Sequence, residues 1–174
     1  TDERSVKVIT IHRSKGLQFP IVYCPFSWNT ASVAKDFVSF HDPDNPSRFI
    51  FDIDPEQSPE HQELARREVL AESSRMLYVA LTRAKYRCTL VWGAFKDAGS
   101  SPLAYLLHAP ELNLNYLPLA TLRQKFEAMD DNQIEQELAT LAEQSSNSIE
   151  VRGLPDFSNE NYRPPVAVRE NVGF

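Results

Sequence analysis

The stretch SSRMLYVALTRAKYRCTLVWG, residues 73–93, decides how the chain folds. Its first half ends a longer segment, about 59–85, in which apolar residues are spaced three, four or seven apart. That spacing predicts an amphipathic helix with one buried face. The following CTLVWGAF, residues 88–95, is rich in apolar and β-branched residues and predicts a buried strand. We therefore expect a helix that leads directly into a core strand.

Two apolar segments near the N-terminus predict two more buried strands. They are VKVITI, residues 6–11, and IVYCPF, residues 21–26, and the polar loop HRSKGLQFP separates them. The order of strand, loop, strand, helix and strand predicts an α/β fold with a parallel sheet. Ligands of such sheets bind outside the carboxyl ends of the strands, and the loop lies at such an end.

The rest of the chain carries weaker signals. Two alternating runs surround the turn cluster DPDNP and predict a β-hairpin insertion over about 37–54. A short helix is expected from Pro102, with Ser100 or Ser101 as its cap. Residues 119–145 predict two helices broken near 130–132. The tail beyond them is rich in Pro, Asn and Ser, with one possible strand at 149–152.

Composition and charge narrow the class of protein. The chain has 174 residues, a net charge of -6 and no apolar run near the ~20 residues of a membrane helix. Two cysteines, Cys24 and Cys88, are too few for a disulfide framework or a zinc site, which favours the cytoplasm. The acidic average conceals two basic segments, because 1–36 carries a net +2 and 76–96 a net +4. A polyanion is expected to dock on those two segments.

Each basic segment allows a functional and a purely structural interpretation. Gly16 permits a tight backbone path, so that backbone N–H groups and Lys15 face an anion, but the loop also suits a solvated turn. Arg83 can present its guanidinium to a phosphate, or it can complement the dipole at a helix C-terminus. Tyr78 is a candidate to stack on a base, or it belongs to the core.

The two segments together resemble a known family. VITIHRSKGLQFPIVYCPF, residues 8–26, followed by SSRMLYVALTRAKYRCTLVWG, resembles motifs V and VI of the UvrD-like superfamily 1 DNA helicases. The SFHD and FDID stretches and the Pro-rich exit look like the RecB-like helicase–nuclease subunits of exodeoxyribonuclease V.

The resemblance implies a domain plan. Residues 1–110 would form part of the second RecA-like motor domain, of the P-loop NTPase type, with helices flanking a parallel sheet. The hairpin at about 37–54 would be an insertion in that domain. Residues 111–147 would form a helical extension, and 148–174 a linker toward a missing downstream domain.

The resemblance also implies roles for single residues. Arg83 matches the arginine that reaches the γ-phosphate of ATP and stabilises charge during its transfer. Gly16 and Gln18 would lie toward the nucleotide, although family members usually carry Glu where this chain has Gln18. The residues that would line the DNA path are Thr10, His12 and Lys15.

The implied partners lie largely outside this chain. ATP with Mg²⁺ would be bound mainly by a missing N-terminal motor domain, because no glycine here is followed by lysine as in a P-loop, and no Asp-Glu pair follows a buried strand. Single-stranded or duplex DNA and RecC- and RecD-like subunits are the other partners, with no membrane role. The fragment alone is expected to be inactive. The alternative is a non-catalytic protein-interaction module that retains the helicase fold.

Overall fold

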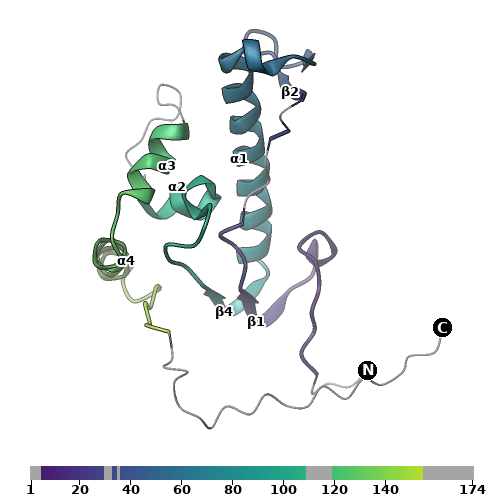
Figure 1. Ribbon diagram of the computed structural model, residues 1–174. Helices are drawn as coiled ribbons and strands as arrows, with labels where there is room; N and C mark the ends of the chain where they lie inside the picture. The colour runs from purple at the N-terminus through teal and green to yellow at the C-terminus, as the bar shows by residue number, and fades with distance from the viewer. Residues whose placement is uncertain (1–4, 30–32, 35, 109–118, 155–174) are drawn as a thin grey trace, which may run out of the picture.

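A computed structural model describes residues 5–29, 33–34, 36–108 and 119–154. Its central element is the long helix α1, Pro59–Leu81 (Figure 1). A hairpin of β2, Val38–His41, and β3, Phe49–Asp52, lies at the start of α1. The parallel strands β1, Phe19–Cys24, and β4, Ala84–Leu90, lie at its other end. The described part of the chain is therefore an α/β structure in which α1 separates two small sheets.

Helix α1 confirms the helix expected from the apolar spacing. Its fully buried apolar residues are Ala65, Leu70, Leu77 and Ala80. It ends at Leu81, four residues before the predicted end, and Thr82 is its C-cap. Because α1 stops there, the chain has room to turn into β4 directly.

The predicted parallel pairing is present between β1 and β4. Residues Val22 and Cys24 pair with Cys88 and Leu90 across the ladder. Strand β4 begins earlier than expected, at Ala84, and ends at Leu90 rather than at residue 95. After Ala84, the residues Lys85, Tyr86 and Arg87 are exposed, so an apolar pattern misses this part of the strand. Beyond Leu90 the chain leaves the strand to reach a separate core.

The strand expected at 6–11 is absent. Residues 6–10 have no regular structure, and Val6 and Val8 are 92% and 94% exposed. An extended segment becomes a strand only when a neighbouring backbone accepts and donates its hydrogen bonds. Among the described residues, β1 pairs with β4 and no strand pairs with 6–10. The β-branched composition of the segment was therefore not sufficient to form a strand.

The predicted hairpin is confirmed as an antiparallel pair. Val38 and Phe40 face inward, 2% and 1% exposed, and pack with Ala65 of α1. Two histidine–carboxylate pairs fix the hairpin to the helix. His61 lies 2.7 Å from Asp52, and the backbone N–H of His41 donates to Glu68 at 2.8 Å.

Three further helices form a second core beside α1. They are α2, Pro102–His108; α3, Leu119–Glu127; and α4, Asp131–Gln144 (Figure 1). The Ser101 hydroxyl accepts the N–H of Ala104 at 3.2 Å, so Ser101 caps α2. The break between α3 and α4 carries a capping box on Asp130. These are the helices expected from Pro102 and within 119–145.

A buried histidine links the three helices to the loop after β4. The His108 side chain is fully buried and lies 2.7 Å from a carboxylate oxygen of Glu137 on α4. The indole Nε1–H of Trp92 donates to His108 Nε2 at 2.8 Å. The Lys125 ammonium on α3 donates to the His108 carbonyl at 2.7 Å. Both ring nitrogens and the carbonyl of this histidine therefore bond to other elements.

The C-terminal tail corrects one prediction. Residues 149–154 have no helix or strand, so the strand expected at 149–152 is absent. The rest of the predicted linker, 155–174, lies outside the described residues. No helix in the described part of the chain is long and apolar enough to cross a membrane.

Candidate functional site

The loop before β1 is a tight, internally bonded turn. The 3₁₀ turn η1, His12–Ser14, begins it, and the N–H of Ser14 donates to the carbonyl of Thr10 at 3.1 Å. The Thr10 hydroxyl accepts the N–H of Arg13 at 3.4 Å. The Ser14 side chain is buried, 5% exposed, and donates to the Ile11 carbonyl at 2.6 Å. These bonds hold the backbone and leave the longer side chains of the loop in solvent.

Gly16, which was expected to allow a tight backbone path, has a left-handed backbone conformation with φ of +81°. A Cβ at this position would meet no atom within 4 Å, so the glycine is required by its dihedral angle and not by crowding. It reverses the chain between η1 and β1. Lys15 and Gln18, on either side of it, are exposed.

Arg83 lies directly after the end of α1 and contacts this loop. Its Nε–H donates to the carbonyl of Val79 at 2.8 Å. One terminal nitrogen donates to the carbonyl of Leu17 at 3.1 Å, and the other donates to the Thr82 hydroxyl at 2.8 Å. Leu17 is 66 positions away in the sequence, so this single side chain joins the two candidate motifs.

A backbone hydrogen bond joins the same two segments. The N–H of Phe19 donates to the carbonyl of Arg83 at 2.8 Å, where β1 and β4 begin. Gln18 lies between the two contacted residues, Leu17 and Phe19. The structure thus brings Gln18 and Arg83 together where β1 and β4 begin, and Gly16 lies one residue from the Leu17 carbonyl. Thr10, His12 and Lys15 lie on the preceding turn, and the His12 ring has no hydrogen bond within the described residues.

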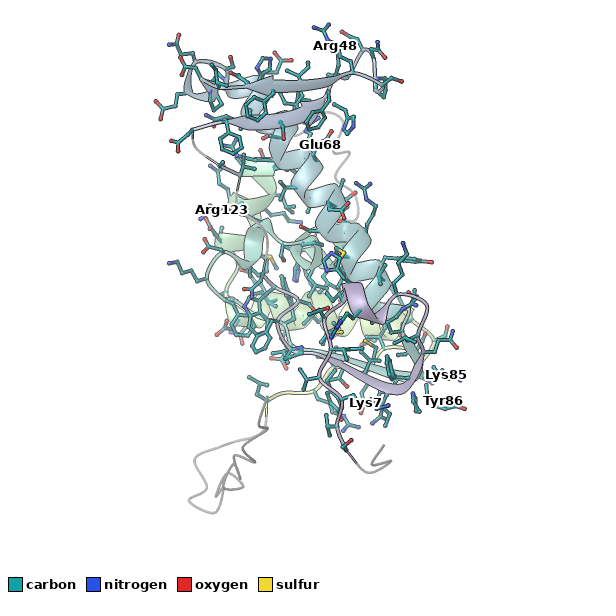
Figure 2. All side chains as sticks on the ribbon, turned by 90° about the vertical axis from the view of Figure 1, so that its right-hand side faces the viewer. Lys7, Arg48, Glu68, Lys85, Tyr86 and Arg123 are labelled. Carbon is teal, nitrogen blue, oxygen red and sulfur yellow. The ribbon has the colours of Figure 1, made fainter. Side chains whose placement is uncertain are left out.

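Within the described residues, several cations of the two basic segments have no acidic partner. On α1, each of Arg66, Arg67 and Arg75 lies within 4.0 Å of a glutamate oxygen. By contrast, several exposed cations near the loop and β4 have no carboxylate partner among the described residues; these are Lys7, Arg13, Lys15, Lys85 and Arg87. Figure 2 shows Lys7 and Lys85 at the same end of the molecule. Unpaired cations at one end create a positive field there.

Two exposed tyrosines lie on the elements next to these cations, and Figure 2 shows Tyr86 at the same end of the molecule as Lys85. Tyr78, on the last turns of α1, is 68% exposed, and Tyr86 of β4 is 84% exposed. The core interpretation of Tyr78 is therefore wrong for this structure. Exposed aromatic rings among unpaired cations are typical of surfaces on which single-stranded bases stack.

The two cysteines lie on neighbouring strands and are free. A hydrogen bond from the Cys88 thiol lowers the pKa of Cys24 to about 7, although partial burial opposes the shift. The same contact raises the pKa of Cys88. Within the described residues no group of three His, Cys, Asp or Glu side chains is arranged to hold a metal ion.

A cavity of about 800 Å³ lies between α1, η3, Ala98–Ser100, and α3, but it does not include the candidate loop or Arg83. Two of its arginines are already paired. Arg66 contacts Glu63, and Arg123 contacts Glu127 and Asp97. The cavity therefore offers neither of these cations free to a nucleotide.

The sequence analysis missed three groups near the junction of the loop with Arg83: the buried Ser14 hydroxyl, the Thr82 hydroxyl and the Leu17 carbonyl. Ser14 and Thr82 are small polar residues in a turn and at a helix end, where such residues are common for reasons of capping alone. A backbone carbonyl has no sequence signal. In the sequence, the position of Thr82 directly before Arg83 was the signal that could have pointed to its hydroxyl.

Comparison with known proteins supports the family resemblance of the segment that holds this site. Residues 1–94 match the model of the UvrD-like helicase C-terminal domain. The chain is similar to the RecBCD enzyme subunit RecB of Escherichia coli, with 41% identity over 92 residues, 52% of this chain and 7% of that protein. RecB of Mycolicibacterium smegmatis is 35% identical over 107 residues, 62% of this chain and 10% of that protein.

A third relative carries a different name. An ATP-dependent helicase/nuclease subunit of Bacillus cereus is 38% identical over 107 residues, 55% of this chain and 8% of that protein. The chain thus spans about a tenth or less of the length of these relatives. The matched segment includes the loop, α1 and Arg83, and more than half of the chain fits the family model. The chain belongs to the UvrD-like helicase C-terminal domain family, and within it the chain is RecB-like.

Proposed function

We propose that this chain is part of the second RecA-like motor domain of an ATP-dependent DNA helicase–nuclease. The observation that carries the proposal is the junction at Arg83, where one guanidinium bonds to the end of α1 and to the carbonyl of Leu17. A motor domain needs such a junction, because a change at the nucleotide must move the segment that holds DNA.

The DNA contacts would come from the loop and its basic surroundings. Thr10, His12 and Lys15 lie on an exposed turn, and the nearby cations lack acidic partners among the described residues. Phosphate groups would neutralise them and release counterions, which makes binding salt-dependent. The exposed rings of Tyr78 and Tyr86 would add stacking on unpaired bases.

The nucleotide contact would come from Arg83, with Gly16 and Gln18 beside it. Three of the five guanidinium N–H groups are already bonded, which leaves one on each terminal nitrogen for a phosphate. The donor set therefore fits an anionic phosphate. It does not fit Mg²⁺, since the described residues hold no carboxylate cluster for a metal. ATP, held with its Mg²⁺ by the other motor half, would supply the γ-phosphoryl group for hydrolysis.

A protein-binding role is the second candidate, and the hairpin favours it. The outer face of β2 and β3 and their flanks exposes Phe37, Phe49, Phe51 and Ile53, each between 48% and 77%. The rings of Phe37 and Phe51 stack with centroids 5.3 Å apart, and contiguous exposed apolar patches mark contact surfaces. Relatives of this chain are named as subunits of the RecBCD enzyme. The proposal therefore includes assembly with RecC- and RecD-like subunits. The two roles use opposite ends of α1 and are compatible (Figure 1).

The DNA role is tested in the complete helicase with Lys15→Ala. We expect weaker single-stranded DNA binding and a salt dependence shallower by about 0.7 per lost phosphate contact. Arg48→Ala is the matched control, because it removes one exposed charge at the hairpin end, opposite Lys7 and Lys85 (Figure 2). An equal effect of the two variants, or no effect of Lys15→Ala, would rule out the loop as a DNA contact.

A further inference from the structure

The hydroxyl of Thr82 is the least expected partner of Arg83. Thr82 is the C-cap of α1, and its O–H donates to the carbonyl of Tyr78 at 2.8 Å. The same oxygen accepts a terminal N–H of Arg83 at 2.8 Å. A hydroxyl has one proton, so donation to a carbonyl leaves its lone pairs for the guanidinium. The last turn of the helix therefore fixes the direction in which the hydroxyl accepts.

The other two bonds of Arg83 leave one terminal nitrogen without an acceptor. Its Nε and one terminal nitrogen bond to the carbonyls of Val79 and Leu17. The second terminal nitrogen has Thr82 as its acceptor. Without that acceptor, torsion about the last side-chain bonds would be restricted by two contacts in place of three. The direction of the remaining N–H groups would then be less well defined.

We propose that Thr82 is a positioning residue, whose hydroxyl orients the Arg83 guanidinium so that its two remaining N–H groups face a nucleotide phosphate. This inference rests on the proposed role of Arg83 and adds the residue that prepares it. A planar guanidinium recognises phosphate through two parallel N–H groups, so its orientation decides how well it binds. Preorganised donors also stabilise developing charge better than mobile ones.

The kinetic test compares Thr82→Val with Thr82→Ser in the complete helicase. Valine keeps the shape and removes the hydroxyl, whereas serine keeps the hydroxyl. We expect Thr82→Val to lower kcat for ATP hydrolysis about 10- to 100-fold with little change in KM, since misplacement of a reacting group by about 1 Å has effects of that size. Thr82→Ser should stay within about threefold of the wild type.

A second readout does not depend on turnover. In the 174-residue chain labelled with ¹⁵N-arginine, the terminal guanidinium N–H signals of Arg83, one of which belongs to the nitrogen that bonds to Thr82, are identified by their loss in Arg83→Lys. We expect these signals to exchange slowly with solvent in the wild type and in Thr82→Ser, and faster in Thr82→Val; equal exchange in all three would show that the hydroxyl does not hold the guanidinium. Far-UV circular dichroism checks that all three proteins are folded.

The outcomes separate this inference from the function on which it rests. If Arg83→Ala loses turnover while Thr82→Val keeps it, the positioning role is wrong and the proposed function stands. If valine and serine lower kcat equally, the hydroxyl is not the cause and the inference also fails. If Arg83→Ala itself keeps normal turnover, both are wrong.

Discussion

The substitution Trp92→Phe tests the buried network that ties the C-terminal helices to the sheet. The indole N–H is a donor only, so His108 Nε2 must accept it at 2.8 Å, and Nδ1 carries the proton given to Glu137 at 2.7 Å. Phenylalanine removes the donor and leaves a fully buried acceptor without a partner. A buried polar group in that state costs about 1–3 kcal/mol.

Trp28→Phe is the matched control for that substitution. Trp28 and Trp92 pack against the same core cluster, and Trp28 stacks on Phe95 with ring centroids 4.1 Å apart. Within the described residues the Trp28 indole has no hydrogen bond. The two variants lose the same number of atoms and both keep an aromatic ring, so the hydrogen bond with His108 is the main difference between them.

Urea unfolding followed by far-UV circular dichroism measures both variants without relying on tryptophan fluorescence. We expect Trp92→Phe to be less stable than Trp28→Phe by about 1–3 kcal/mol. In a chain of this size that corresponds to a melting temperature lower by roughly 2–4 °C for each kcal/mol. Equal stabilities would refute the reasoning, because they would mean that His108 Nε2 does not depend on the indole.

Two further predictions concern the second core and the hairpin. A Cβ on Gly99 would lie 3.2 Å from both the Arg123 carbonyl and the Phe126 ring, so Gly99→Ala should cost about 1–3 kcal/mol in urea unfolding, whereas Gly153→Ala, which meets nothing within 4 Å, should be neutral. A hydrogen bond with His61 is the main reason that the pKa of Asp52 is lowered from 3.8. The stabilisation that this hydrogen bond gives to the fold is therefore present above pH 3.8, and it is lost as the pH falls through the lower pKa of Asp52 in the folded state. The stability difference between wild type and Asp52→Asn should disappear at low pH, and a difference that persists would contradict this ion pair.

The elements with a strong local pattern were predictable from the sequence. The apolar spacing of α1 identified its buried face, which includes Leu70 and Leu77. The turn cluster located the hairpin, and the loop glycine, Gly16, has the φ of +81° that a tight turn requires. In each of these cases the cause lies within a few residues of the effect.

The features that depend on distant partners were not predictable. The segment 6–11 has the composition of a strand, but composition does not supply a neighbouring backbone. Strand β4 begins at Ala84 because β1 pairs with it there, although Lys85 and Arg87 interrupt the apolar pattern. The bond from Arg83 to the Leu17 carbonyl depends on tertiary structure and on a backbone atom, so the sequence placed Arg83 near an anion without indicating what holds it.

The central claim is that Arg83 acts on the nucleotide of a helicase motor, and γ-phosphate cleavage by the complete enzyme tests it most directly. Arg83→Ala should slow single-turnover cleavage about 10³- to 10⁵-fold, the range for a lost arginine finger, while DNA affinity stays close to the wild type. Arg75→Ala, which removes an exposed arginine paired with Glu72 on the same helix, should cleave normally. Normal cleavage by Arg83→Ala would contradict the account.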